Sequence, residues 1–130
     1  MIIDTSVLIA ILRREPGYEH HIISMVSATD TLSISAATMV EAHIVTQRLH
    51  LDGLEERLVE LITDQGIIIE PFSASQMTIA ATAHRSYGKG GGHPAQLNFG
   101  DCFSYALAKE RDEPLLFKGN DFAQTDLTAA

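Results

Sequence analysis

The sequence contains one cysteine, few basic residues and no long hydrophobic run. Its single cysteine, Cys102, cannot form an internal disulfide, which fits a reducing compartment. No apolar run approaches the ~20 residues that a membrane-spanning helix needs. The apolar N-terminus also lacks the basic segment and the small-residue cleavage site of a signal peptide. We therefore expect a cytoplasmic protein without membrane contact, in which Cys102 is a small buried hydrophobic residue rather than a nucleophile.

Nine Lys and Arg residues oppose 17 Asp and Glu residues, and the formal net charge is −8. This balance argues against a protein that holds nucleic acid by charge alone, because such domains are usually basic. It does not exclude an enzyme that acts on nucleic acid. Carboxylates clustered around a divalent cation lower the formal charge, and the cation restores attraction for phosphate.

The length of 130 residues favours one domain spanning residues 1–130. The hydrophobic pattern predicts short strands at 1–3, 31–35, 67–69 and 115–117, and helices at 6–14, 18–28, 36–50, 54–65, 74–87 and 99–110. Strands that alternate with helices predict a three-layer α/β/α sandwich on a mostly parallel sheet of four to five strands. The run Ile67–Ile69 predicts a strand buried on both faces. The glycine-rich segment 88–94 predicts a mobile loop, and the last residues a helical turn or a short edge strand.

Four acidic residues occupy equivalent kinds of position in this arrangement. Asp4 follows the first strand, and Glu41 lies in the first turns of the helix after the second strand. Asp101 begins the helix before the fourth strand, and Asp121 follows that strand. Because strand ends of a parallel sheet converge on one edge, the four carboxylates should meet in one cleft. Carboxylates this close raise one another's pKa, so the cluster indicates a hard divalent ion such as Mg²⁺.

Each acidic residue also has a structural alternative. Asp4 alone could cap the following helix, but beside the other three acids it is expected to be a metal ligand, which leaves the cap to Thr5 or Ser6. Thr38 and Glu41 match a capping box. Against this, Glu41 is expected to face inward, because it shares a helix face with apolar residues at positions 37, 44 and 45. Asp101 could be an N-cap, and Asp121 could be an ordinary turn residue.

Further polar residues are candidates with weaker support. Thr5 and Ser6 could hold a water molecule or a phosphate oxygen, or they could cap a helix. Asn98 could orient Asp101 or serve as a turn residue. Four basic or titratable residues near the glycine-rich loop and the last turn could follow a phosphate backbone or form a solvated surface: Arg85, Lys89, His93 and Lys118. The six histidines show no metal-ligand spacing.

The sequence resembles the PIN-domain proteins, and more narrowly the VapC toxins of bacterial toxin–antitoxin pairs. The resemblance covers essentially the whole chain and rests on Ile2–Ser6, the inward Glu41, Leu97–Ala106 and Leu116–Phe122. Its specific parts are Asn-Phe-Gly-Asp and Lys-Gly-Asn-Asp-Phe. The resemblance implies a Mg²⁺- or Mn²⁺-dependent ribonuclease that cleaves structured RNA, often tRNA or rRNA, forms a homodimer and is silenced by a VapB antitoxin. It assigns the family's acidic positions to Asp4, Glu41, Asp101 and Asp121, and its small hydroxyl position to Thr5 or Ser6.

We therefore expect a metal-dependent endoribonuclease in which Asp4 and Asp101 hold the ion. Glu41 and Asp121 would complete the site, directly or through water. One alternative is a metal-dependent phosphatase with an aspartyl nucleophile, although that chemistry commonly uses a second Asp where Ser6 stands. Another is a non-catalytic binding module. By the same resemblance, apolar surface on the segments 6–14, 18–28 and 54–62 would bury the antitoxin or the second subunit.

Overall fold

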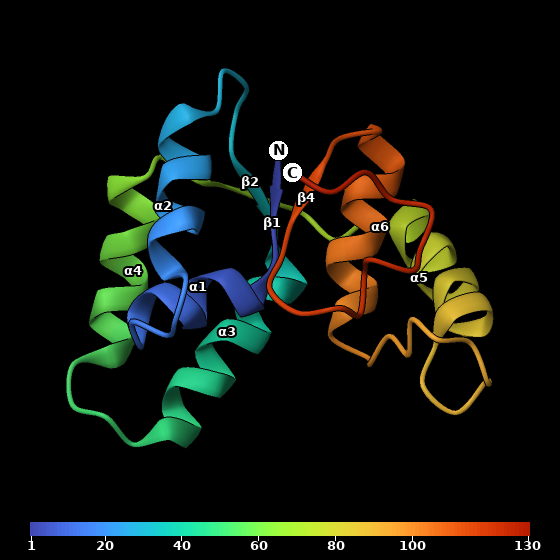
Figure 1. Ribbon diagram of the computed structural model, residues 1–130, viewed down its shortest axis with the longest axis horizontal. Coiled ribbons are helices and arrows are strands. Elements are labelled where there is room, and N and C mark those ends of the chain that lie inside the picture. The colour runs from blue at the N-terminus through green and yellow to red at the C-terminus, as the bar shows by residue number, and fades with distance from the viewer.

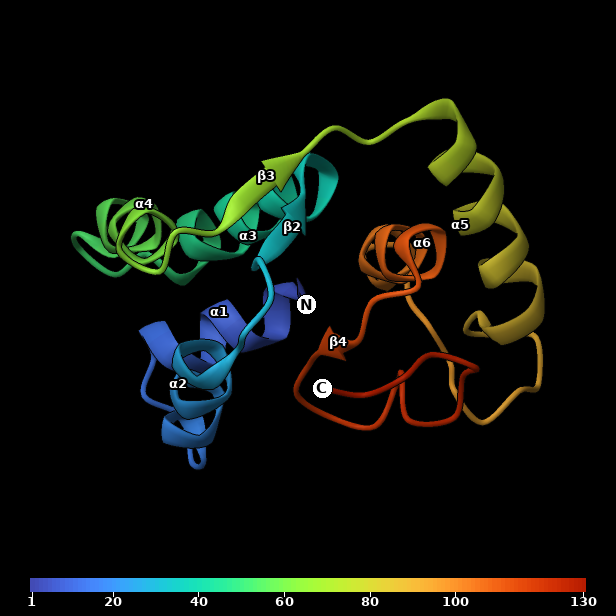
Figure 2. The ribbon, with the colours of Figure 1, turned by 90° about the horizontal axis from the view of Figure 1, so that it is seen from above.

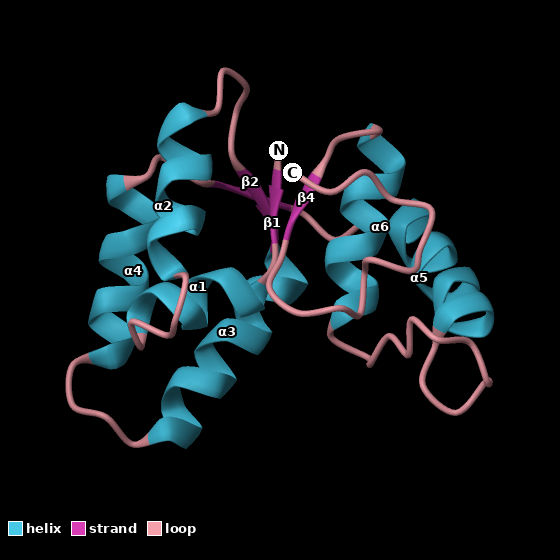
Figure 3. Ribbon diagram, viewed as in Figure 1, coloured by secondary structure: helices cyan, strands magenta, loops and turns pink.

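Four short parallel strands form the centre of the molecule in the computed structural model, which describes residues 1–130 (Figure 3). The strands are β1 (Ile2–Ile3), β2 (Ser33–Ser35), β3 (Ile68–Glu70) and β4 (Leu115–Leu116). They lie in the order β3-β2-β1-β4, and every neighbouring pair is parallel. This confirms the expected sheet and its number of strands.

Six helices cover the two faces of the sheet. They are α1 (Thr5–Leu12), α2 (Tyr18–Ser27), α3 (Ala36–Leu49), α4 (Leu54–Asp64), α5 (Ala74–Tyr87) and α6 (Asp101–Arg111). Helices α1 to α4 lie on one side and α5 and α6 on the other, as Figures 1 and 2 show. The α/β/α layering expected from the sequence is therefore confirmed. No helix combines the length and the apolar character that would let it cross a lipid bilayer.

The central strands divide the core into two parts. Successive side chains of a strand point to opposite faces of its sheet. Accordingly, Ile2 and Leu115 pack with residues of α5 and α6, whereas Ile3 and Leu116 pack with residues of α1 to α4. All four side chains are buried. Both helical layers are thus anchored on β1 and β4, the two strands that lead into Asp4 and Lys118.

The prediction that the third strand is buried on both faces was wrong. Strand β3 is an edge strand, and the side chains of Ile68 and Ile69 are each 49% exposed. An apolar run alone does not distinguish an edge strand from a central one. At the opposite edge, the N–H of Leu115 donates to the carbonyl of Thr128 at 2.9 Å, so the last residues form the short edge pairing that was one of the two expectations.

Helix α3 buries a different face from the one that its apolar residues predict. Val40 and Ile44 are 59% and 41% exposed, whereas the buried face consists of Thr38, Met39, Ala42 and Thr46. The two threonines are tolerated in the core because their hydroxyl groups are hydrogen-bonded there, Thr46 to a backbone carbonyl and Thr38 to another side chain. The apolar pattern therefore selected the wrong side of this helix.

Cys102 is the second residue of α6, and its side chain is almost completely inaccessible. Burial raises the pKa of its thiol to about 11, and the neighbouring Asp101 adds to that effect. A thiol that stays protonated is a poor nucleophile. The expectation of a small buried hydrophobic residue is confirmed.

Candidate active site

The strand order places a crevice at the carboxyl ends of β1 and β4. The chain runs from β1 through β2 to β3 on one side and returns to β4 on the other side of β1, and ligands of open α/β sheets bind where the strand order reverses. A pocket of about 310 Å³ lies at this point. The structure brings all four expected acidic residues and all three supporting residues to its lining: Asp4, Glu41, Asp101, Asp121, Thr5, Ser6 and Asn98.

Asp4 is buried, and both of its carboxylate oxygens accept hydrogen bonds. Oδ2 accepts from the backbone N–H and the hydroxyl of Ser6, at 2.9 and 2.6 Å. Oδ1 accepts from the hydroxyl of Ser104 at 2.7 Å. Asp4 is therefore the N-cap of α1, and the expectation that Thr5 or Ser6 takes over the cap was wrong. A carboxylate has about four acceptor positions, so the cap leaves room for a further ligand.

A pair of buried hydroxyl groups supports Asp4 from behind. Ser104 on α6 and Thr38 on α3 are both fully buried, and their oxygens are 3.1 Å apart. Sequence reasoning missed Ser104. The available signal was its position three residues after Asp101, because residues at this spacing share a helix face.

The capping box considered as an alternative role for Thr38 and Glu41 is absent. The N-cap of α3 is Ser35, whose hydroxyl accepts from the N–H of Ala37 at 3.2 Å. The Thr38 hydroxyl is instead directed to Ser104. The helix begins three residues earlier than a Thr38 cap requires, which frees the Glu41 carboxylate from a capping role.

Glu41 is half-buried at the rim of the pocket rather than on an apolar face, since Ile44 on its side of α3 is exposed. Its Oε2 accepts from the hydroxyl of Thr5 at 2.7 Å. Burial raises the pKa of Glu41; the Thr5 hydrogen bond opposes this effect, and the charge of Asp4 reinforces it. Glu41 therefore lies in the pocket, as the sequence predicted. The predicted reason, an inward apolar face of the helix, was wrong.

Gly100 makes room for the Glu41 carboxylate. A Cβ atom on Gly100 would lie 2.0 Å from Glu41 Oε1, which is far inside van der Waals contact. The backbone of Gly100 is ordinary right-handed helix, with φ of −65°. Glycine is therefore needed here for space, and it fixes how closely α6 approaches Glu41.

We predict that Gly100→Ala lowers activity at least tenfold with little change in stability, because the new methyl group displaces a flexible carboxylate rather than the backbone. A shift of about 1 Å in a catalytic group is enough for such a loss. Cleavage rate and thermal unfolding measure the two effects. Gly91→Ala, in the glycine-rich loop, is the matched control and should keep the parent rate. An unchanged rate in Gly100→Ala would show that the position of Glu41 is unimportant.

Asp101 and Asn98 hold each other in place at the start of α6. The N–H of Asn98 donates to Asp101 Oδ2 at 2.8 Å, and the N–H of Asp101 donates to Asn98 Oδ1 at 2.9 Å. Burial raises the pKa of Asp101 to about 7, with further contributions from the negative charges of Asp4, Asp121 and Glu41; the hydrogen bond from Asn98 opposes the shift. Of the two roles considered for Asn98, the structure shows contacts that orient Asp101.

This shift predicts a pH-dependent stability of the metal-free protein. An acid whose pKa is raised on folding stabilises the fold only while it is protonated, so stability should fall as the pH rises from 3.8 to about 7. Asp101→Asn mimics the protonated form. In the presence of a chelator, this variant should melt several degrees above the parent at pH 8, and the difference should vanish toward pH 4. Equal melting temperatures at pH 8 would contradict the raised pKa.

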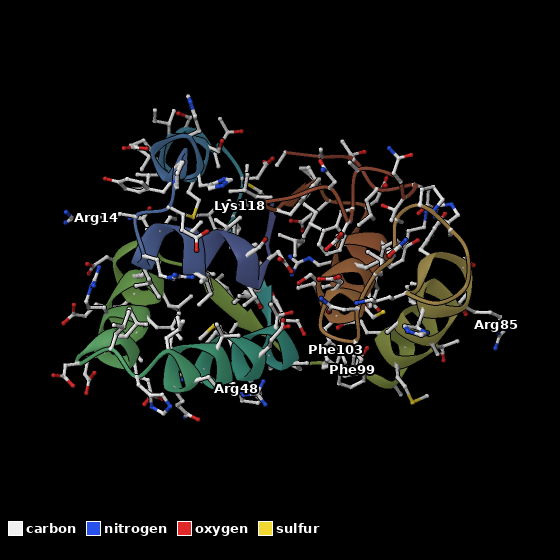
Figure 4. All side chains as sticks on the ribbon, turned by 60° about the horizontal axis from the view of Figure 1, so that its bottom comes forward. Arg14, Arg48, Arg85, Phe99, Phe103 and Lys118 are labelled. Atoms are coloured by element: carbon white, nitrogen blue, oxygen red, sulfur yellow. The ribbon has the colours of Figure 1, made fainter.

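Of the four candidate phosphate contacts, only Lys118 lines the pocket. Arg85 lies on the outer side of α5, away from Lys118 (Figure 4). His93 packs edge-on against the ring of Tyr87, with 4.9 Å between the ring centres. Lys89 is exposed in the loop that follows α5. The structure therefore does not gather these four side chains into one basic patch.

The pocket suits a hard divalent cation in its donor chemistry. Its acidic residues offer only oxygen ligands. Burial and the neighbouring negative charges together raise the pKa of Asp101, and a cation would relieve the repulsion among those charges. No three His, Cys, Asp or Glu side chains converge closely enough to form a metal-binding cluster on their own. Mg²⁺ does not require this, because it commonly takes one or two carboxylates and completes its shell with water and substrate oxygens.

Comparison with known proteins identifies the class to which this fold and site belong. The family model described as PIN domain matches residues 1–127. The chain therefore belongs to the PIN-domain family.

Relatives within that family bear the name VapC. Ribonuclease VapC28 of Mycobacterium tuberculosis is 44% identical over 130 residues, which cover 100% of this chain and 97% of the relative. The VapC ribonuclease R02377 of Rhizobium meliloti is 41% identical, over 96% of this chain and 97% of the relative. These identities place the chain among the VapC ribonucleases, as its resemblance to VapC toxins indicated.

Solved structures share the fold at low sequence identity. VapC20 of Mycobacterium tuberculosis, described as a toxin that cleaves the sarcin-ricin loop, has a TM-score of 0.77 at 13% identity and covers 99% of this chain and 97% of its own. VapBC2 of Rickettsia felis, bound to a DNA fragment of its promoter, has a TM-score of 0.75 at 11% identity, with coverage of 99% and 96%. A toxin–antitoxin complex of Klebsiella pneumoniae has a TM-score of 0.71 at 18% identity, with coverage of 99% and 95%. At these identities the likeness establishes the fold.

Proposed function

We propose that this chain is the toxin of a toxin–antitoxin pair and acts as a Mg²⁺-dependent endoribonuclease that hydrolyses phosphodiester bonds. The observation that carries the proposal is the meeting of four carboxylates, contributed by four separate segments of the chain, in one pocket at the switch point of the sheet. Gathering this much like charge costs free energy unless a cation compensates it, so the cluster favours a metal site. The relatedness to VapC ribonucleases supports the choice of RNA as substrate.

Asp4 and Asp101 would hold the cation, because both are buried and both are fixed by hydrogen bonds to neighbouring groups. Bound Mg²⁺, or Mn²⁺, would supply a Lewis acid that polarises the phosphodiester and favours deprotonation of water. Asp121 lies at the exposed mouth of the pocket, where it can complete the site directly or through water.

We assign the positioning of the attacking water to Glu41. Burial raises its pKa, which makes its carboxylate a better proton acceptor than an ordinary Glu side chain. The Thr5 hydroxyl fixes the direction of its carboxylate. Water attacks the phosphorus, Glu41 takes up a proton of that water, and the bond from phosphorus to the leaving sugar oxygen breaks. The leaving oxygen takes a proton from solvent and departs as a hydroxyl group. Ser6 serves the site indirectly, through its two hydrogen bonds to Asp4.

The proposed substrate is structured RNA, with tRNA or rRNA as the expected classes. Arg85, Lys89 and His93 lie outside the pocket, so any contact from them is with RNA beyond the cleavage site. These side chains would contact RNA phosphates. Phosphate contacts contribute affinity without selecting a sequence.

The proposed partners are a VapB-type antitoxin and a second copy of the chain. Helix α1 supplies little surface for them, because six of its eight residues are buried within the chain. Exposed apolar side chains remain elsewhere: Ile23 and Val26 on α2, Val40 and Ile44 on α3, Met77 on α5, and Phe99 just before α6. We propose that the groove beside α5 and α6 is covered in the assembly, because seven of its eight lining residues are apolar and a contiguous apolar groove commonly marks an interaction site.

Expression in bacterial cells tests the function in vivo. The parent chain should arrest growth, and sequencing of RNA 5′ ends after induction should show new ends at a few sites in tRNA or rRNA. Asp101→Asn should allow normal growth and show no new ends. Growth arrest by both proteins, without new RNA ends, would instead favour a binding module that acts without cleavage.

A further inference from the structure

Lys118 is the only basic residue that lines the carboxylate pocket. Its backbone is tied directly to the site: the N–H of Lys118 donates to the Ser6 hydroxyl at 2.9 Å, and that hydroxyl donates to Asp4. In Figure 4 its side chain lies between α1 and the segment that follows β4. The sequence left two alternatives open for Lys118, a contact with phosphate or a place on a solvated surface.

The structure pairs the Lys118 ammonium with Glu15, in the turn after α1. Glu15 also lines the pocket, so it adds a fifth carboxylate to the four of the site. A second cation, the guanidinium of Arg13, lies 3.1 Å from the other oxygen of the Glu15 carboxylate. Lys118 and Glu15 are 38% and 25% exposed, and ion pairs with this much access to water contribute little to stability.

We propose that Lys118 binds a phosphate group of RNA in this pocket, and that Glu15 competes with that phosphate for the ammonium. The inference rests on the proposed function and names a substrate contact together with the contact that opposes it. Carboxylate and phosphate oxygens make the same kind of charge-assisted hydrogen bond, so one can replace the other at a lysine. Displaced Glu15 keeps its pairing with Arg13, which reduces the cost of exchange.

The competition also has a simple electrostatic basis. With Glu15 ionised, the only ammonium in the pocket is neutralised before RNA arrives, and the pocket presents an uncompensated set of acidic groups to a polyanion. When a phosphate group replaces Glu15 at Lys118, the positive charge of the lysine stabilises the bound RNA instead. Lysine suits this exchange because its ammonium is a compact charge on a flexible stem.

Binding of a fluorescently labelled single-stranded RNA oligonucleotide to the full-length protein, measured by anisotropy with a chelator present, tests the proposal without cleavage. Lys118→Ala should weaken binding about fivefold, and Glu15→Gln should tighten it about threefold, within the range of exposed ion pairs. Glu15→Gln should have no effect when Lys118 is already Ala, because the two residues act on one contact. Lys118→Ala should also flatten the slope of log affinity against log salt by ~0.7, the value for one phosphate contact on a single strand.

A second ion pair provides the matched control. Lys109 and Asp126 are 2.7 Å apart and 46% exposed, and they line a different pocket beside α5 and α6. Lys109→Ala and Asp126→Asn should leave the affinity and its salt slope unchanged.

The results separate this inference from the proposed function. Parental affinity and slope in Lys118→Ala would overturn the phosphate contact, and weaker binding by Glu15→Gln would overturn the competition in favour of a positioning role for Glu15. Cleavage by the parent protein in Mg²⁺ is scored independently, and its absence would count against the proposed function alone. Where cleavage occurs, kcat/KM should follow the order Glu15→Gln, parent, Lys118→Ala, from highest to lowest.

Discussion

Asp4→Asn is expected to lower RNA cleavage at least hundredfold while the chain remains folded. The substitution removes a charge that the proposed site needs for its cation, and metal centres typically contribute several kcal/mol to such reactions. The fold should persist because the Asn carbonyl can still accept from the N–H of Ser6 and cap α1. The Ser104 hydroxyl, now a donor to Asp4, can turn and accept from the new amide. Cleavage of RNA in Mg²⁺ and the far-ultraviolet circular dichroism spectrum measure the two outcomes.

Asp126→Asn is the matched control for this prediction. Asp126, like Asp4, is an acidic residue near one terminus of the chain. Its carboxylate accepts hydrogen bonds from Tyr105 and Lys109, outside the carboxylate pocket. The control should cleave at the parental rate. Parental cleavage by Asp4→Asn would remove Asp4 from the site and with it the proposed metal centre.

Ser104→Ala is expected to reduce both activity and stability, although Ser104 does not reach the pocket. It removes the hydroxyl that donates to Asp4 Oδ1 at 2.7 Å and leaves the Thr38 hydroxyl without its partner. Leaving buried polar groups unpaired costs about 1–3 kcal/mol of unfolding free energy. A carboxylate that is free to rotate should also lower the cleavage rate about tenfold or more. Urea unfolding and cleavage rates, taken well below the melting temperature, separate the two effects.

Thr38→Val tests whether the effect passes through Asp4. It preserves the shape of the side chain and removes only the outer hydrogen bond, while the bond from Ser104 to Asp4 remains. Its activity should therefore stay close to that of the parent even if its stability falls. Equal loss of activity in Thr38→Val and Ser104→Ala would show that general loosening of the core, rather than the position of Asp4, is responsible.

The sheet and the meeting of the four acids were accessible from sequence because both follow from the order of elements. Parallel strands connected by helices bring their carboxyl ends to one edge, so Asp4 and Asp121 are placed by topology alone. Asp101 follows because α6 runs against the strands and starts at the same edge. None of these placements depends on the detailed packing of side chains.

The finer structure of the site depends on packing and could not be predicted in this way. Ser104 and Thr38 look like ordinary polar helix residues, and only the contact between α3 and α6 makes them a buried pair behind Asp4. Gly100 looks like a helix-start glycine, but its role depends on how near Glu41 lies. The pairing of Glu15 with Lys118 joins residues 103 positions apart. Three-dimensional distances decide each of these features, and sequence spacing does not record them.

The dependence of RNA cleavage on divalent metal tests the central claim most directly. Purified parent protein is incubated with RNA in Mg²⁺, then with excess chelator, and then with Mg²⁺ or Mn²⁺ restored. The carboxylate pocket predicts cleavage that stops when the cation is removed and returns when either cation is added back. Cleavage that continues at the same rate in the presence of chelator would contradict the account.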